Sequence, residues 1–164
     1  MTTAAGQIYV KVAHHAVGRA DDTLVTLGLG SCVAILLHDR LARVGGLAHV
    51  LLPEPALARD QSNPAKFAST AVPLLLKELE GLGGRTGRME ARLVGGASMF
   101  TSLMVPGSLN MGERNVRAAR EALRRAGIPV LAEAVGGDFG RSVRFTVGEG
   151  KTVVTSVGKP DVVL

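Results

Sequence analysis

Cysteine is nearly absent from this chain of 164 residues, and aromatic residues are scarce. The single cysteine, Cys32, excludes an internal disulfide and fits a reducing, cytoplasmic location. Aromatic residues make up 3% of the sequence and tryptophan is missing, so we expect a core built from Val, Leu and Ala. No run of about 18 apolar residues occurs, which argues against membrane insertion. The first residues also lack the pattern of a signal peptide, so secretion is not expected.

The overall composition is that of a globular protein. Hydrophobic residues make up 46% and charged residues 20%, and the length predicts a single domain over residues 1–164. The net charge of +5 raises the possibility of nucleic-acid binding. However, the Lys and Arg residues are scattered and no aromatic platform accompanies them. We therefore expect no nucleic-acid partner, and the charge favours attraction to an acidic protein instead.

The hydrophobic pattern predicts an α+β fold with about eight strands and two main helices. The helices are expected at 64–82 and 111–126, the second with Asn110 as its cap and Gly127 after its last residue. Pro73 interrupts the first helix, which either kinks there or starts later. The predicted strands cover 7–13, 25–29, 32–38, 43–52, 90–94, 129–135, 142–147 and 152–157.

Cys32 lies at the start of an apolar run in TLGLGSCVAILLHD, which we interpret as the first strand of a hairpin. A symmetric turn centred between Arg40 and Leu41 would place Cys32 directly opposite His49. Opposed residues have Cβ atoms about 4.5–5.5 Å apart, close enough for a hydrogen bond or a thiolate–imidazolium pair. A single bulge in either strand would move His49 to the other face.

The residues before Cys32 suit a nucleophile. The backbone N–H groups of Ser31 and Cys32 are predicted to point at a developing oxyanion, and Gly30 lets a substrate approach the backbone closely. Thr26 is six residues away, about 20 Å in an extended strand. It joins this site only if the glycines bend the chain back, and it would then orient the imidazole of His49.

Structural interpretations compete with this chemistry. A lone cysteine among apolar residues is usually a small buried hydrophobic residue, and a lone histidine on a strand is often structural. The dinucleotide pattern GxGxxG fails, because Val33 stands at its third glycine. The four histidines lack metal-ligand spacing with acidic or cysteine partners, so no metal and no cofactor are expected.

Five separated segments resemble, in this order, blocks of the CheD family of bacterial chemotaxis: TLGLGSCVAILLHD, VGGLAHVLLPEP, RLVGGASMF, MGERNVRAARE and AEAVGGDFGRSVRF. The resemblance covers roughly residues 7–157. It implies a three-layer α/β/β fold with mixed sheets, related to the catalytic domain of cytotoxic necrotizing factor. It also implies a cytoplasmic cysteine hydrolase that converts chemoreceptor glutamine to glutamate. Cys32 matches the family nucleophile, His49 the general base and Thr26 the third catalytic residue.

The resemblance further implies partners. Chemoreceptors are the expected substrates, and a CheC-type phosphatase is an expected binding partner. The alternative function is a non-catalytic or weakly catalytic module that regulates the CheC phosphatase. The sequence departs from the family pattern at Phe67-Ala68-Ser69 and at Ala134, which puts loop contacts and partner affinity in doubt more than the chemistry. It leaves open which receptor glutamine is used.

Overall fold

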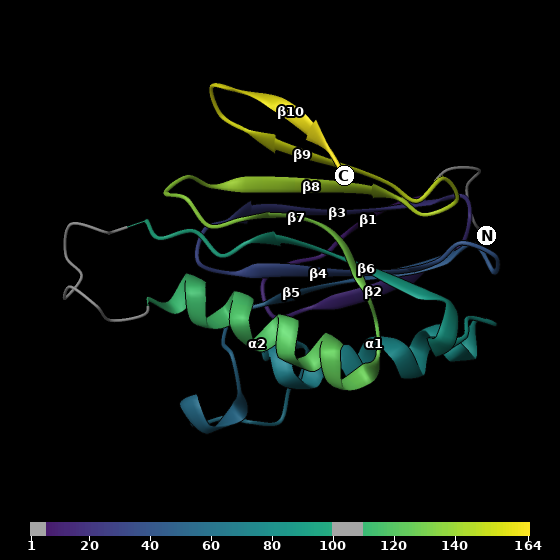
Figure 1. Ribbon diagram of the computed structural model, residues 1–164, viewed down its shortest axis with the longest axis horizontal. Coiled ribbons are helices and arrows are strands. Elements are labelled where there is room, and N and C mark those ends of the chain that lie inside the picture. Colours follow the sequence, from purple (N-terminus) through teal and green to yellow (C-terminus); the bar gives the residue numbers. More distant parts are fainter. Residues whose placement is uncertain (1–5, 100–109) are drawn as a thin grey trace.

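Two β-sheets stack against each other, and a layer of two helices covers the outer face of one of them (Figure 1). This arrangement comes from a computed structural model, which describes residues 6–99 and 110–164. The first sheet holds, in spatial order, β1 (Gly6–Tyr9), β3 (Asp22–Leu29), β8 (Arg141–Thr146), β9 (Lys151–Ser156) and β10 (Lys159–Val163). The second sheet holds β2 (His15–Gly18), β5 (Val44–Val50), β4 (Val33–Asp39), β6 (Met89–Gly95) and β7 (Val130–Val135).

The layers confirm the predicted α+β, α/β/β class. Both sheets are mixed, because β1 runs parallel to β3 and β6 runs parallel to β7, while the other pairings are antiparallel. One apolar core lies between the second sheet and the helices, and another lies between the two sheets. The second sheet is therefore covered on both faces.

The central strands β4 and β5 are buried at every position, which explains their nearly continuous apolar sequences. Successive side chains alternate between the two cores: Ile35 faces the helices, and Leu36 faces the first sheet. Burial of each such side chain contributes about 1.5–3 kcal/mol to folding. His49 lies on β5 and Cys32 directly precedes β4, whereas Thr26 lies on β3 of the other sheet.

The second helix, α2 (Met111–Ala126), has the predicted bounds and ends. The Asn110 side chain accepts a hydrogen bond from the Glu113 N–H at 2.9 Å, and Gly127 follows in the left-handed conformation. The first helix, α1 (Ala68–Gly81), begins later than residue 64. A separate 3-10 turn, η2 (Pro64–Lys66), precedes it. Two further 3-10 turns are η1 (Pro55–Leu57) and η3 (Thr86–Arg88).

The predicted register of the β4–β5 hairpin is wrong by two residues. His49 lies opposite Ala34, not opposite Cys32. The Asp39 carboxylate accepts hydrogen bonds from the N–H groups of Leu41 and Ala42, and the turn therefore spans four residues instead of two. Because the shift is an even number, every side chain keeps the predicted face.

The first and last strands also differ from prediction. The strand expected over residues 7–13 ends at Tyr9, as β1, and a further strand that was not expected, β2, follows at His15–Gly18 in the other sheet. Ala13, with a φ of 63°, lies in the turn between them. The edge strand β10 was not expected, because its residues are exposed and include Pro160, features typical of an edge.

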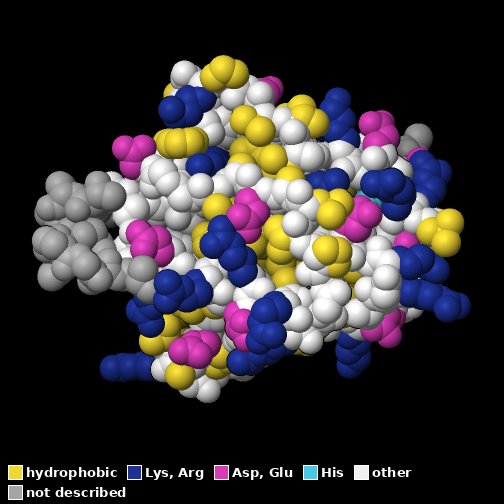
Figure 2. All heavy atoms as spheres, viewed as in Figure 1, with side chains coloured by type: hydrophobic (Ala, Val, Ile, Leu, Met, Phe, Trp, Pro, Cys, Tyr) yellow, Lys and Arg dark blue, Asp and Glu magenta, His cyan; other side chains and the backbone are white. Residues whose placement is uncertain are grey.

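Neither α1 nor α2, the α-helices of the described residues, is long and apolar enough to cross a bilayer. On the face drawn in Figure 2, Lys and Arg side chains are interspersed with acidic ones and do not gather in one tract.

Candidate active site

The chain passes from the first sheet to the second between β3 and β4, on the left in Figure 1. The pairing of β3 with β8 shifts register between Thr26 and Leu29, and Gly28 adopts a φ of 69°. A left-handed residue is needed for this bend, and glycine adopts that conformation without strain. Leu29, directly after Gly28, still pairs with Arg141 in the first sheet, so Gly28 forms a bulge near the end of β3. The chain crosses to the second sheet at residues 30–32, which leaves Thr26 on one sheet and Cys32 beside the other.

Thr26 and His49 meet across the space between the sheets. Thr26 Oγ1 lies 2.6 Å from His49 Nδ1, and it also lies 2.6 Å from the Val10 carbonyl oxygen. A hydroxyl has one proton, which it must donate to the carbonyl because a carbonyl only accepts. The oxygen of Thr26 therefore accepts from His49 Nδ1–H. This arrangement selects the tautomer in which Nε2 carries a lone pair.

His49 is poised as a neutral base. Its side chain is fully buried, and this burial lowers the pKa of the imidazole from 6.5 to about 4. Among the described residues, Nε2 has no hydrogen-bond partner. His38 Nε2 is likewise buried without a partner within the described segments, so the feature that distinguishes His49 is the hydrogen bond of its Nδ1 with Thr26. At neutral pH Nε2 of His49 can accept a proton.

Cys32 lies on the same face of the second sheet as His49. Its side chain is 9% exposed and packs in the core between the sheets, next to Ala34 in sequence alternation. Ala34 is directly opposite His49, and Cys32 stands two positions before Ala34, just ahead of the first residue of β4. Among the described residues, no hydrogen bond joins the Cys32 sulfur to His49 Nε2. Burial raises the pKa of the Cys32 thiol. The resting pair is thus a neutral thiol and a neutral imidazole, in place of an ion pair.

The backbone around Cys32 is held by the end of β6. The Gly96 N–H donates to the Cys32 carbonyl at 2.8 Å, and the Ala97 N–H donates to the Gly30 carbonyl at 2.8 Å. A Cβ on Gly95 would lie 2.3 Å from the Cys32 carbonyl oxygen, so only glycine fits there. Among the described residues, no carbonyl accepts from the N–H of Ser31 or Cys32, and the Cys32 N–H faces the residue's own sulfur. Their role toward an oxyanion stays a prediction.

Sequence reasoning missed Asn115. This residue of α2 is fully buried, and its Nδ2 donates to the carbonyls of Ser31 and Leu51, both at 3.0 Å. Asn115 thereby ties the segment of Cys32 to the strand that carries His49. The sequence did contain a signal for Asn115. It lies four residues before Ala119, on the face of α2 that is otherwise apolar and buried.

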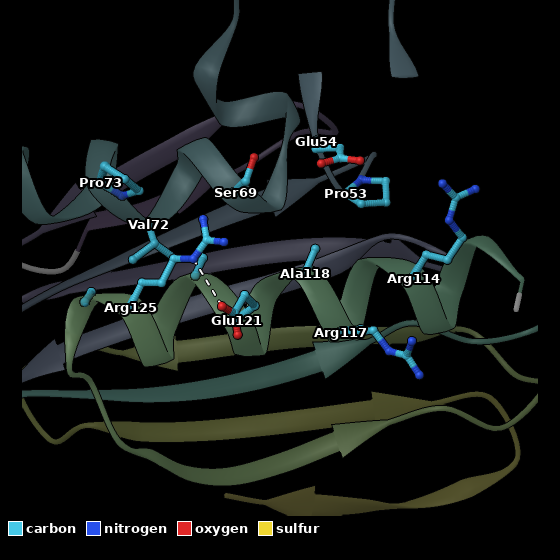
Figure 3. Close-up of a pocket in the computed structure, with 12 residues that line it drawn as sticks. Pro53, Glu54, Ser69, Val72, Pro73, Arg114, Arg117, Ala118, Glu121 and Arg125 are labelled. Carbon is cyan, nitrogen blue, oxygen red and sulfur yellow. Dashed lines mark hydrogen bonds and ion pairs between the residues drawn. The ribbon is translucent and has the colours of Figure 1, made fainter. Parts of the chain in front are cut away.

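A separate groove of about 630 Å³ lies between α1 and α2 (Figure 3). It is on the helical side of the second sheet, away from Cys32 and His49. Its residues include Ser69 and Glu54 but no histidine or cysteine, and the Glu121 carboxylate there is bound by Arg125. Within the described residues, no group of three His, Cys, Asp or Glu side chains is placed to hold a metal ion.

The family model of CheD, described as chemotactic sensory transduction, matches residues 51–156. The chain belongs to the CheD family. The probable chemoreceptor glutamine deamidase CheD of Desulforamulus reducens is 42% identical over 94% of this chain and 93% of its own length. The protein of the same name from Moorella thermoacetica is 44% identical, with 94% and 93% covered.

Two solved structures have weaker similarity to this CheD chain. A Neisseria meningitidis protein of the DUF152 family aligns with a TM-score of 0.47 and 14% identity, covering 82% of this chain and 63% of its own. The Bacillus licheniformis hypothetical protein YfiH aligns with a TM-score of 0.44 and 16% identity, covering 73% and 49%.

The family match begins after all three predicted catalytic residues of this CheD chain. Membership is therefore supported by the remainder of the fold and by relatives aligned over most of the length. The roles of Cys32, His49 and Thr26, and of Gly30 and Ser31 in substrate binding, stay predictions.

Proposed function

We propose that this CheD protein deamidates glutamine side chains of chemoreceptors in the cytoplasm, with Cys32 as nucleophile, His49 as base and Thr26 as the residue that orients the base. The observation behind this proposal is the hydrogen-bond chain from His49 through Thr26 to the Val10 carbonyl. It directs the free lone pair of the imidazole to Nε2, which is what a general base requires. The printed names of the relatives, glutamine deamidases, support the same reaction.

In the first step, the Cys32 sulfur attacks the side-chain amide carbon of glutamine as its proton moves to His49 Nε2. Because the thiol pKa is raised and the imidazole is neutral, the proton moves during the attack and not before it. The carbonyl oxygen becomes an oxyanion, which the N–H groups of Ser31 and Cys32 would bind. Gly30, without a side chain, lets the substrate come close to these donors.

In the second step, the C–N bond breaks and His49 returns the proton to the leaving nitrogen, which departs as ammonia. A thioester joins Cys32 to the former glutamine side chain. His49 then removes a proton from water as the water oxygen attacks the thioester carbon. Breakage of the C–S bond gives glutamate and restores the thiol. The balance is one amide and one water converted into one carboxylic acid and one ammonia.

The proposal is tested with a soluble chemoreceptor fragment and the purified full chain. We expect ammonia release and the mass change of amide-to-carboxylate conversion at glutamine, and we expect Cys32→Ala and His49→Gln to abolish both. His38→Gln is the matched control, since His38 is a buried imidazole on the neighbouring strand β4. Unchanged activity of folded Cys32→Ala would refute the mechanism.

The second candidate is a module that binds and regulates a CheC-type phosphatase. The groove between α1 and α2 favours it, because this surface lies apart from Cys32 and can be occupied without blocking the thiol. In this case Cys32→Ala would bind CheC like the wild type, and the wild-type protein would leave every receptor glutamine intact.

A further inference from the structure

Arg141, the first residue of β8, is a nearly buried cation that has no acidic partner in the part of the chain that the structure describes. Its side chain is 7% exposed, and no carboxylate of the described residues forms an ion pair with it. Arginine is almost never buried to this degree unless it is paired. Burial also lowers the pKa of the guanidinium, as expected for a charge that the protein does not compensate.

The guanidinium of Arg141 uses only part of its hydrogen-bonding capacity. Nη1 donates to the Gly136 carbonyl at 2.8 Å and, at 3.5 Å, to the Gly95 carbonyl. The ring of Phe139 lies 4.2 Å from the central carbon of the guanidinium and supports it from one side. Among the described residues, no acceptor receives a hydrogen bond from Nε or Nη2 of Arg141. Neither nitrogen is fully buried, so both can be reached from outside. These N–H groups are available to an acceptor from outside.

Arg141 lines a cleft of about 460 Å³. Its described lining contains three hydroxyl side chains and no carboxylate: the residues are Gly28, Phe139, Gly140, Arg141, Ser142, Thr155, Ser156 and Val157. A second cation, Lys159, places its Nζ 4.4 Å from the ring of Phe139. Two positive charges beside one ring, with hydroxyl donors around them, favour an anion.

The cleft adjoins the candidate active site. Gly28, in its wall, lies near the end of β3, and the next residue, Leu29, pairs with Arg141 just before the chain crosses to Cys32. Gly95 contacts both places, because its carbonyl faces Arg141 and its Cα packs on the Cys32 carbonyl. In Figure 1 the β3–β4 connection and the β7–β8 loop lie at the same end of the molecule.

We propose that this cleft binds an acidic side chain of the polypeptide substrate, next to the glutamine that is deamidated. The planar fork of Arg141 matches a carboxylate in two parallel hydrogen bonds. Lys159, on the ring of Phe139, adds positive charge near the cleft. The bound carboxylate would anchor the substrate backbone beside Cys32 and select glutamines with a nearby acidic residue. This inference depends on the proposed deamidase function.

The test compares two soluble chemoreceptor fragments, one native and one in which the glutamates around each deamidated glutamine are changed to alanine. For the wild-type chain we expect kcat/KM to fall roughly tenfold or more on the neutralised fragment, mainly through KM, as for loss of a charged hydrogen bond. In Arg141→Met the two fragments should become equal. Arg144→Met, an exposed arginine on the same strand, is the matched control and should keep the wild-type ratio.

Equal kcat/KM of the wild type on both fragments would overturn the proposal. So would an Arg141→Met variant that loses activity equally on both, because this is the result of a purely structural arginine. If Arg141→Met does not fold, the exposed Lys159→Gln replaces it and should reduce the ratio between the fragments.

Binding separates this inference from the reaction itself. By calorimetry, Cys32→Ala should bind the native fragment more tightly than the neutralised one, and this difference should disappear when Arg141→Met is added. If the wild-type protein releases no ammonia but the binding preference is intact, the deamidase function is refuted and the carboxylate site is retained. Competition by inorganic phosphate as strong as that by the native fragment would show a general anion site and overturn the proposal.

Discussion

Replacement of Thr26 by valine isolates the hydroxyl that joins His49 to the backbone. Valine has the shape of threonine but cannot donate to the Val10 carbonyl or accept from His49 Nδ1–H, both now at 2.6 Å from Oγ1. Thr26 is 1% exposed, so water does not replace the lost partner at its position. Two buried polar groups are left unpaired by the substitution.

The expected effects follow from these two lost bonds. Each unpaired buried group costs about 1–3 kcal/mol, so the free energy of unfolding should fall by about 2–6 kcal/mol. The imidazole also loses the interaction that selects its Nδ1–H tautomer. If one hydrogen bond of about 1–3 kcal/mol is lost from the transition state, kcat falls by roughly 5-fold to 150-fold.

Urea unfolding measures the first effect, and ammonia release from a chemoreceptor fragment measures the second. Thr26→Ser is the control, because it keeps the hydroxyl and removes only a methyl group. We expect its kcat to stay within a few-fold of wild type, by the small cost of one methyl group. A folded Thr26→Val protein with wild-type kcat would refute the orienting role of Thr26.

Four further predictions concern the same site. Burial lowers the pKa of His49 to about 4, and only the neutral imidazole acts as a base. The value of kcat/KM should therefore fall when the pH is lowered to about 4. A fall of kcat/KM already near pH 6.5 would contradict this. The same pKa shift stabilises the fold fully above pH 6.5, and this contribution is lost as the pH falls toward 4, where the unfolded chain already binds the proton. Because burial raises the pKa of Cys32, iodoacetamide should label it more slowly than free cysteine at neutral pH; faster labelling would indicate a resting thiolate. In Gly95→Ala the new Cβ would lie 2.3 Å from the Cys32 carbonyl oxygen, so this variant should have lower stability and lower kcat. Gly87→Ala is the control, because no atom lies within 4 Å of its Cβ, and its stability should change by less than about 0.5 kcal/mol. Equal effects of the two substitutions would refute the close approach at Gly95.

Local signals in the sequence were sufficient for some elements. The bounds of α2 follow from Asn110 and Gly127, because capping depends on hydrogen bonds within a few residues. The face shared by Cys32 and His49 follows from strand alternation, which survives a register shift of two. The exact pairing did not follow, because the carboxylate of Asp39 reshapes the turn through its own hydrogen bonds.

Contacts between distant segments were beyond the sequence. Asn115 holds the Cys32 segment across the helix–sheet interface, and Arg141 donates to the Gly136 carbonyl of the β7–β8 loop, with no carboxylate partner among residues 6–99 and 110–164. Neither property is visible in the residue type or in its neighbours. Only packing decides which buried polar atoms find partners.

The sequence by itself determined the α+β class, the position of α2 and the three residues Thr26, Cys32 and His49 as candidates, since these depend on periodicity, caps and residue chemistry. The tertiary structure decided whether those residues meet. Thr26 and His49 belong to different sheets, and the hydrogen bond between them exists because the two sheets stack face to face.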